Sequence, residues 1–120
     1  MSSPIFHNFP EAPTHVEPFS HAVECDSWVQ LTGQMPTYPD DDRRSLPKGI
    51  RAQTRRVMEN LMIILSQLDL KLEDVLSVRI YLTNFKRDYE TMNETYKTYF
   101  CDNKLPARTF IGVTGLARDA

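Results

Sequence analysis

One arginine, Arg108, stands where its side chain could bind an acid group. It follows Pro106 closely and opens the predicted strand Arg108–Val113. A guanidinium presents a planar fork of N–H groups, which matches a carboxylate with two charge-assisted hydrogen bonds. At the start of a strand, such a side chain can be held at a sheet edge and face a pocket. Arg108 is therefore a candidate carboxylate ligand, and the alternative is an ion pair with a surface acid.

Two other positions carry polar groups that fit a pocket. Asn93 lies on the mostly apolar face of a predicted helix, between Tyr89 and Tyr96. A buried amide needs hydrogen-bond partners, which either the backbone or a pocket can supply. Thr32 precedes Gly33 at the end of a predicted strand, where a glycine lets a ligand approach the backbone or marks a bulge. Both readings remain open for each position.

Cysteine and histidine usage predicts neither a metal site nor another cofactor. Cys25 and Cys101 have no CxxC spacing, so two unpaired thiols are expected in a reducing compartment. The histidines are scattered, without an HxH or HxxxH pair that could ligate zinc.

Composition indicates one soluble globular domain. The chain has 120 residues, of which 41% are hydrophobic and 25% charged. Its formal net charge of -2 gives no general attraction to nucleic acid or to an anionic membrane. The longest apolar run, Leu61–Leu65, is too short to span a bilayer, and no secretory signal is visible. A cytoplasmic location is expected.

The elements that must position these residues follow from periodicity. Ser20–Cys25 and Trp28–Gln34 are predicted strands joined by a tight turn, after a short strand-like piece within Pro4–Phe9. An amphipathic helix is predicted from Ile50 to about Asp69, because apolar residues recur there at spacings of three and four. The next elements are a strand at residues 75–83, a helix at about 86–100 and the strand that Arg108 opens.

The order β-β-β-α-β-α-β predicts an α+β fold, a two-layer sandwich in which two helices cover one face of a mixed β-sheet. The uncovered face carries residues that combine apolar bodies with polar tips, namely Trp28, Gln30, Thr32, Arg79 and Tyr81. Such side chains suit burial against other subunits, so an oligomer is expected.

Four segments, in this order, resemble the reactive-intermediate deaminase (Rid) family, also called the YjgF-like or L-PSP endoribonuclease family. They are Pro18–Val23 (PFSHAV), Leu31–Pro36 (LTGQMP), residues 81–100 and Leu105–Gly115 (LPARTFIGVTG). Residues 53–65 (QTRRVMENLMIIL) are similar to the family's first helix. The similarity covers almost the whole chain from about Pro10, as a single Rid-family domain over residues 1–120.

The resemblance implies a chorismate-mutase-like fold, a homotrimer and pockets shared between subunits. It also implies an enzyme without a cofactor, a hydrolase like the 2-iminobutanoate/2-iminopropanoate deaminases. Such enzymes convert reactive 2-imino acids (enamine or imine tautomers) into 2-keto acids and ammonia. Holding the carboxylate aligns the imine carbon with a bound water, which a backbone carbonyl or an acid must orient.

The resemblance also implies roles for individual residues. Arg108 matches the family's carboxylate clamp and is the predicted catalytic residue, and Asn93 matches an Asn that orders the pocket. Thr32 stands where a hydroxyl lies near the substrate, and Gly33 lets the backbone approach it. Phe19 replaces a frequent Tyr and would wall the pocket. Phe110 replaces a Cys found in some members, which argues against thiol chemistry.

One part of the family pattern has no counterpart in residues 1–120. Members continue past the LARDA segment, residues 116–120, into one more central strand, which carries a Glu associated with the catalytic water. We expect that strand to be missing after Ala120, so no residue here takes the role of that Glu. Its absence would leave unpaired backbone edges beside Val113.

Two alternatives compete with imine hydrolysis. The first is a non-catalytic carboxylate binder or holdase on the same fold. The second is a single-stranded RNA endoribonuclease, suggested by a basic run made up of Arg43, Arg44, Lys48, Arg51, Arg55 and Arg56. Three aspartates, residues 40–42, precede this run, and no aromatic ladder interleaves with it, so nucleic acid is disfavoured as a partner.

Overall fold

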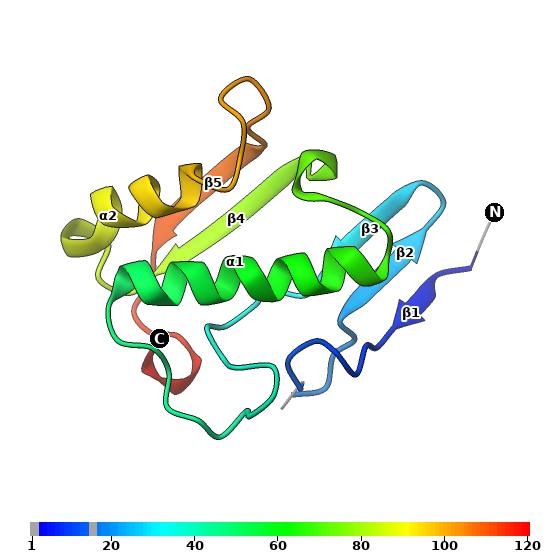
Figure 1. Cartoon of the computed structure of the whole chain (residues 1–120), viewed down its shortest axis with the longest axis horizontal. Helices are drawn as coiled ribbons and strands as arrows, with labels where there is room; N and C mark the ends of the chain where they lie inside the picture. The colour runs from blue at the N-terminus through cyan, green and yellow to red at the C-terminus, as the bar shows by residue number, and fades with distance from the viewer. Residues whose placement is uncertain (1–2, 15–16) are drawn as a thin grey trace.

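The computed structural model describes residues 3–14 and 17–120. Within them, the elements follow the predicted order (Figure 1). The strands are β1 (Ile5–His7), β2 (Ala22–Cys25), β3 (Trp28–Leu31), β4 (Ser77–Leu82) and β5 (Ala107–Gly112). The helices are α1 (Ile50–Gln67) and α2 (Phe85–Lys97), and a short 3-10 turn (Leu72–Asp74) precedes β4.

The first three strands form an antiparallel sheet in the order β1-β2-β3. The turn between β2 and β3 pairs Cys25 with Trp28, as the tight turn predicted there requires. Asp26 takes a φ of 55° in this turn, and aspartate tolerates that left-handed conformation better than most residues.

The last two strands form a separate parallel pair, β4-β5. A parallel pair needs a crossover connection, and α2 supplies it. The register places Val78 opposite Arg108 and Ile80 opposite Phe110. Antiparallel and parallel ladders are thus both present, but in the described residues they form two sheets rather than one continuous sheet.

Helix α1 joins the two sheets into one fold. Ile64, which is 0% exposed, packs with Val29 and Leu31 of the first sheet. Earlier in the same helix, Met58 packs with Val78 and Ile80 of the second sheet. Figure 1 shows α1 running across both sheets, with α2 beside it over β4 and β5. The predicted two-layer α+β architecture is confirmed.

The opposite face of the strands is open. Trp28, Gln30, Arg79 and Tyr81 are all exposed, as the alternation in their strands predicted. In β5, Ile111 lies opposite Tyr81 and is 43% exposed, so it extends the same face. This surface presents apolar side chains together with an arginine, without a covering layer in the described residues.

Candidate functional site

Arg108 lies on the helix-covered side of β5, next to α2. Its register partner is Val78, which packs with the helices. From α2, Asn93 turns its side-chain oxygen toward the guanidinium, and Nη1 of Arg108 donates a hydrogen bond of 2.7 Å to it. Asn93 thus orients a charged group that remains exposed.

Aromatic rings flank the guanidinium of Arg108. Its central carbon lies 5.2 Å from the ring centre of Tyr96 and 5.1 Å from that of Phe110. Phe110 is itself held by ring contacts with Phe85 and Tyr89. Rings at this distance attract a cation and restrict its motion.

The positive charge of Arg108 is not neutralised by a carboxylate. None of the ion pairs in the described residues includes Arg108. The hydrogen bond that Arg108 donates to Asn93 uses one N–H of five, so the remaining donors of the guanidinium can take a carboxylate. This geometry does not support the alternative in which Arg108 pairs with a surface acid.

Tyr96 adds a buried phenol beside the guanidinium. The residue is 5% exposed, and its hydroxyl has no hydrogen-bond partner in the described structure. Burial raises the pKa of Tyr96, and the positive charge of Arg108 offsets part of that effect. The phenol therefore stays protonated and neutral, so it does not compete with a substrate anion for Arg108.

The other predicted site residues lie beside the first sheet, with Phe19 ahead of β2 and with Thr32 and Gly33 just after β3. The backbone N–H of Thr32 donates to the carbonyl of His21 at 3.0 Å, and its hydroxyl donates to the carbonyl of Ser20. Gly33 follows at the surface, with no atom within 4 Å of a Cβ built on it. Phe19 is 36% exposed. The structure gathers Arg108, Asn93 and Phe110 in one group, and places Thr32, Gly33 and Phe19 in a second group.

Sequence reasoning missed Asn60, which holds the segment after β3. This residue is 0% exposed, although it lies in the middle of α1. Its amide nitrogen donates to the carbonyls of Met35 (3.0 Å) and Thr37 (2.8 Å), and its oxygen accepts from Nε of Arg56 at 3.2 Å. A polar residue between apolar helix positions was the available signal, because a buried amide must find partners.

Two clefts on the surface of the chain lie away from Arg108. One surrounds the start of α1, and the other lies between the end of α1 and the loop after α2. Neither is lined by Arg108 or Asn93.

In the part of the chain that is described, no three His, Cys, Asp or Glu side chains gather to hold a metal, and no helix is long and apolar enough to cross a bilayer. His15 lies outside the described residues.

The sequence and the fold match a known family. The sequence profile of the endoribonuclease L-PSP family matches residues 9–120. The chain belongs to this family, which is the Rid, or YjgF-like, family that the segment resemblance predicted.

Individual relatives agree with this assignment. A RutC family protein of Pyrococcus abyssi is 36% identical over 110 residues, covering 91% of this chain and 84% of the relative. The mouse 2-iminobutanoate/2-iminopropanoate deaminase is 32% identical over 108 residues, covering 90% of this chain and 78% of the enzyme. The crystal structure of E. coli TdcF with bound serine superposes with a TM-score of 0.86 at 27% identity, covering 96% of this chain and 90% of TdcF.

Proposed function

We propose that this protein hydrolyses 2-imino acids to 2-keto acids and ammonium, with Arg108 holding the substrate carboxylate. The observation that carries the proposal is the environment of the Arg108 side chain. It is exposed, oriented by Asn93 at 2.7 Å, flanked by two aromatic rings and free of a carboxylate partner. The mouse relative is named an imine deaminase, which supports the same reaction class here.

The reaction needs little more than positioning. Water adds to the carbon of the protonated C=N bond, a proton moves to the nitrogen, and the C–N bond breaks to release ammonia, which leaves as ammonium. The protonated imine is already electrophilic, so the protein need not form a covalent bond to it. Fixing the carboxylate on Arg108 turns the attack of a held water into an oriented, effectively unimolecular step.

The substrate would bind between subunits of a homotrimer. The Arg108 group lines neither of the two clefts described above, and the Thr32 group lies beside the other sheet. We propose that Arg108, Asn93 and Phe110 of one protomer face Thr32, Gly33 and Phe19 of its neighbour. The serine in TdcF supports a small amino-acid-like ligand in this fold.

The group that activates the water has no assigned residue. In the described residues, β3 pairs only with β2 and β4 pairs only with β5, and both sheets rest on α1. Strand edges that rest on one helix with no partner are open to a further strand. We propose that the acid that orients the water is carried by a strand that pairs at these edges.

The test is an ammonia-release assay with 2-imino acids generated in place by an amino-acid oxidase. The protein should shorten the lifetime of the imine and release ammonia and 2-keto acid in equal amounts, while heat-denatured protein should not. Binding of 2-keto acids without any acceleration would instead support the non-catalytic binder. If the protein bound neither 2-imino acids nor 2-keto acids, both the hydrolase and the non-catalytic binder would be contradicted.

The open face should be the contact between subunits. Ile111→Glu places a charge beside Tyr81 in the middle of that face and should convert the trimer to monomers, because a buried unpaired charge is costly. Met62→Glu is a matched control, since Met62 is also 43% exposed but lies on α1. Size-exclusion chromatography with light scattering measures the mass. A trimeric Ile111→Glu, or a monomeric wild type, would rule out this interface.

A further inference from the structure

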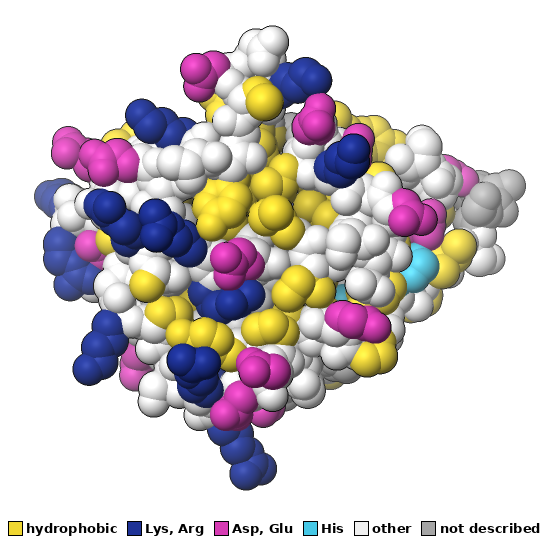
Figure 2. Space-filling model, viewed as in Figure 1, with side chains coloured by type: hydrophobic (Ala, Val, Ile, Leu, Met, Phe, Trp, Pro, Cys, Tyr) yellow, Lys and Arg dark blue, Asp and Glu magenta, His cyan; other side chains and the backbone are white. Residues whose placement is uncertain are grey.

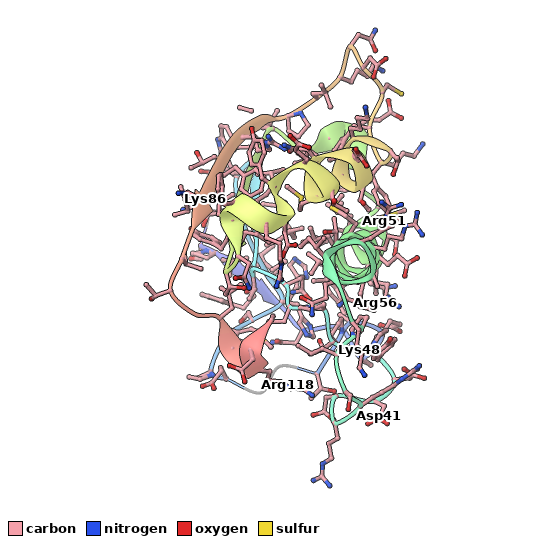
Figure 3. The ribbon with its side chains drawn as sticks, turned by 90° about the vertical axis from the view of Figure 1, so that its left-hand side faces the viewer. Asp41, Lys48, Arg51, Arg56, Lys86 and Arg118 are labelled. Atoms are coloured by element: carbon pink, nitrogen blue, oxygen red, sulfur yellow. The ribbon has the colours of Figure 1, made fainter. Side chains whose placement is uncertain are left out.

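A second site is suggested by the cleft at the start of α1, far along the chain from Arg108. It has a volume of about 530 Å³, which lies within the usual range for small-molecule sites. Its charged and aromatic lining consists of Tyr38, Lys48, Arg51, Arg55, Arg56 and Glu59. Figure 2 shows Lys and Arg side chains gathered over the end of the molecule where α1 and α2 begin. Figure 3 turns this end toward the viewer, with Lys48, Arg51 and Arg56 around the first turns of α1.

Most of the positive charge in the cleft has no strong partner. Arg56 is paired with Glu59 at 3.1 Å and also bonds Asn60, so it is neutralised. Arg51 reaches Glu94 at only 3.9 Å, and both side chains are more than half exposed, which makes this pair weak. Lys48 and Arg55 take part in none of the ion pairs in the described residues. The cleft therefore holds three cations in excess over its single carboxylate pair.

The helix itself adds to this potential. Gly49 caps α1 without a side-chain hydrogen bond, and the first turn contains no acidic residue. Backbone N–H groups at the start of a helix carry partial positive charge and commonly receive aspartate or glutamate there. Here the side chains at the helix start are basic instead. Their repulsion with the partial positive charge of the helix start lowers stability unless a bound anion offsets it.

The opposite wall of the cleft is held in place. The guanidinium of Arg44 stacks 3.8 Å from the ring centre of Tyr38. Arg118, from the turn at the other end of the chain, donates to the carbonyls of Asp42 (2.7 Å) and Arg44 (3.1 Å). The loop that carries Tyr38 is thus fixed from two sides, which lowers the entropy cost of ligand binding.

The cleft is separate from the Arg108 group. Thr91 lines the cleft and Asn93 binds Arg108, and both belong to α2. Side chains two residues apart on an α-helix differ in direction by about 200°, so those of Thr91 and Asn93 point to opposite sides of α2. A ligand in the cleft would not contact the residues of the proposed imine site.

We propose that this cleft binds the phosphate group of a small phosphorylated molecule. Two arginines and a lysine supply the donors that phosphate oxygens prefer, and Tyr38 with Pro47 and Ile50 offers an apolar wall for the rest of the molecule. The limited volume of the cleft and the lack of an aromatic ladder favour a small ligand over an RNA strand. The inference does not depend on the proposed imine hydrolysis.

The test is calorimetric titration of the full chain with inorganic pyrophosphate and with ADP. Binding should have a Kd of about 1 mM or tighter, and should weaken when NaCl rises from about 0.05 M to about 0.2 M. Lys48→Gln with Arg55→Gln should weaken it by about tenfold or more, because two charge-assisted contacts are lost. Arg43→Gln, an equivalent change on an exposed arginine outside the cleft lining, should leave it unchanged.

The titrations with ADP and pyrophosphate distinguish the kinds of ligand that the cleft could bind. Tighter binding of ADP than of pyrophosphate assigns the cleft to a phosphate ester, and equal binding assigns it to a free phosphate anion. No saturable binding of either probe, or the same Kd in the double variant and the wild type, overturns the proposal. It is also overturned if single-stranded RNA binds through Lys48 and Arg55 while both small probes do not. Imine hydrolysis should be unchanged in the double variant, so that the two sites fail or succeed separately.

Discussion

Arg108→Ala is expected to lower kcat/KM for a 2-imino acid by about 100-fold or more, equivalent to roughly 2.7 kcal/mol of transition-state stabilisation. The reason is that, in the proposed mechanism, the exposed guanidinium holds the substrate carboxylate and so sets the orientation of the imine carbon. Because the side chain is exposed and makes one side-chain hydrogen bond, its removal should leave the fold intact. The measurement is the ammonia-release assay with the imine generated in place, together with circular dichroism to check folding.

Three companion variants separate the causes of that loss. Arg108→Lys keeps the charge but lacks the fork, so it should recover only part of the activity. Asn93→Leu leaves the charge and removes the group that orients it, which should raise KM by about tenfold with a smaller change in kcat. Arg43→Gln removes an exposed arginine outside the site and should be neutral. Wild-type activity in Arg108→Ala would end the proposed mechanism.

Asn60→Ala should destabilise the protein by about 2–4 kcal/mol. Its amide is 0% exposed and satisfies two backbone carbonyls, those of Met35 and Thr37. Removing the amide leaves both carbonyl acceptors without their donor and opens a cavity beside the middle of α1, where the side chain was buried. Urea unfolding, compared at equal protomer concentration, should show a lower midpoint with an unchanged slope.

Two further substitutions make the Asn60 prediction specific. Asn60→Asp has almost the same volume but presents an acceptor to two carbonyls, so it should destabilise at least as much as alanine. Asn103→Ala removes an exposed amide in the loop before β5 and should change the unfolding free energy by less than about 0.5 kcal/mol. A wild-type midpoint in Asn60→Asp would show that these hydrogen bonds do not hold the segment after β3.

The Arg108 and Asn60 predictions concern different parts of the proposed site. Asn60 fixes residues 35–37, which follow directly on the Thr32 and Gly33 segment of the proposed pocket. Loss of Asn60 should therefore reduce activity through the fold, whereas loss of Arg108 should reduce activity with the fold intact. Measuring both stability and kcat/KM for each variant distinguishes the two effects.

The sequence by itself determined the elements and their faces. Apolar spacings of three and four placed α1, and alternation in Val75–Thr83 separated the packed side of β4 from the side that carries Arg79 and Tyr81. These patterns are reliable because they arise from the local periods of helix and strand. Asn93 could be singled out in the same way, since an amide on an apolar stripe requires partners, whereas Arg108 was singled out chiefly because the LPART segment resembles the family's carboxylate clamp.

Only the tertiary structure decided which of these groups meet. The contact between Arg108 and Asn93 joins residues 15 apart, and Asn60 reaches carbonyls 23 and 25 residues away. The division of the strands into two sheets over α1 and the basic cleft at its start likewise depend on packing between distant segments. A local period states which side of an element is buried. Which side chains then lie within hydrogen-bonding distance follows from how the elements pack, and sequence spacing alone does not contain that information.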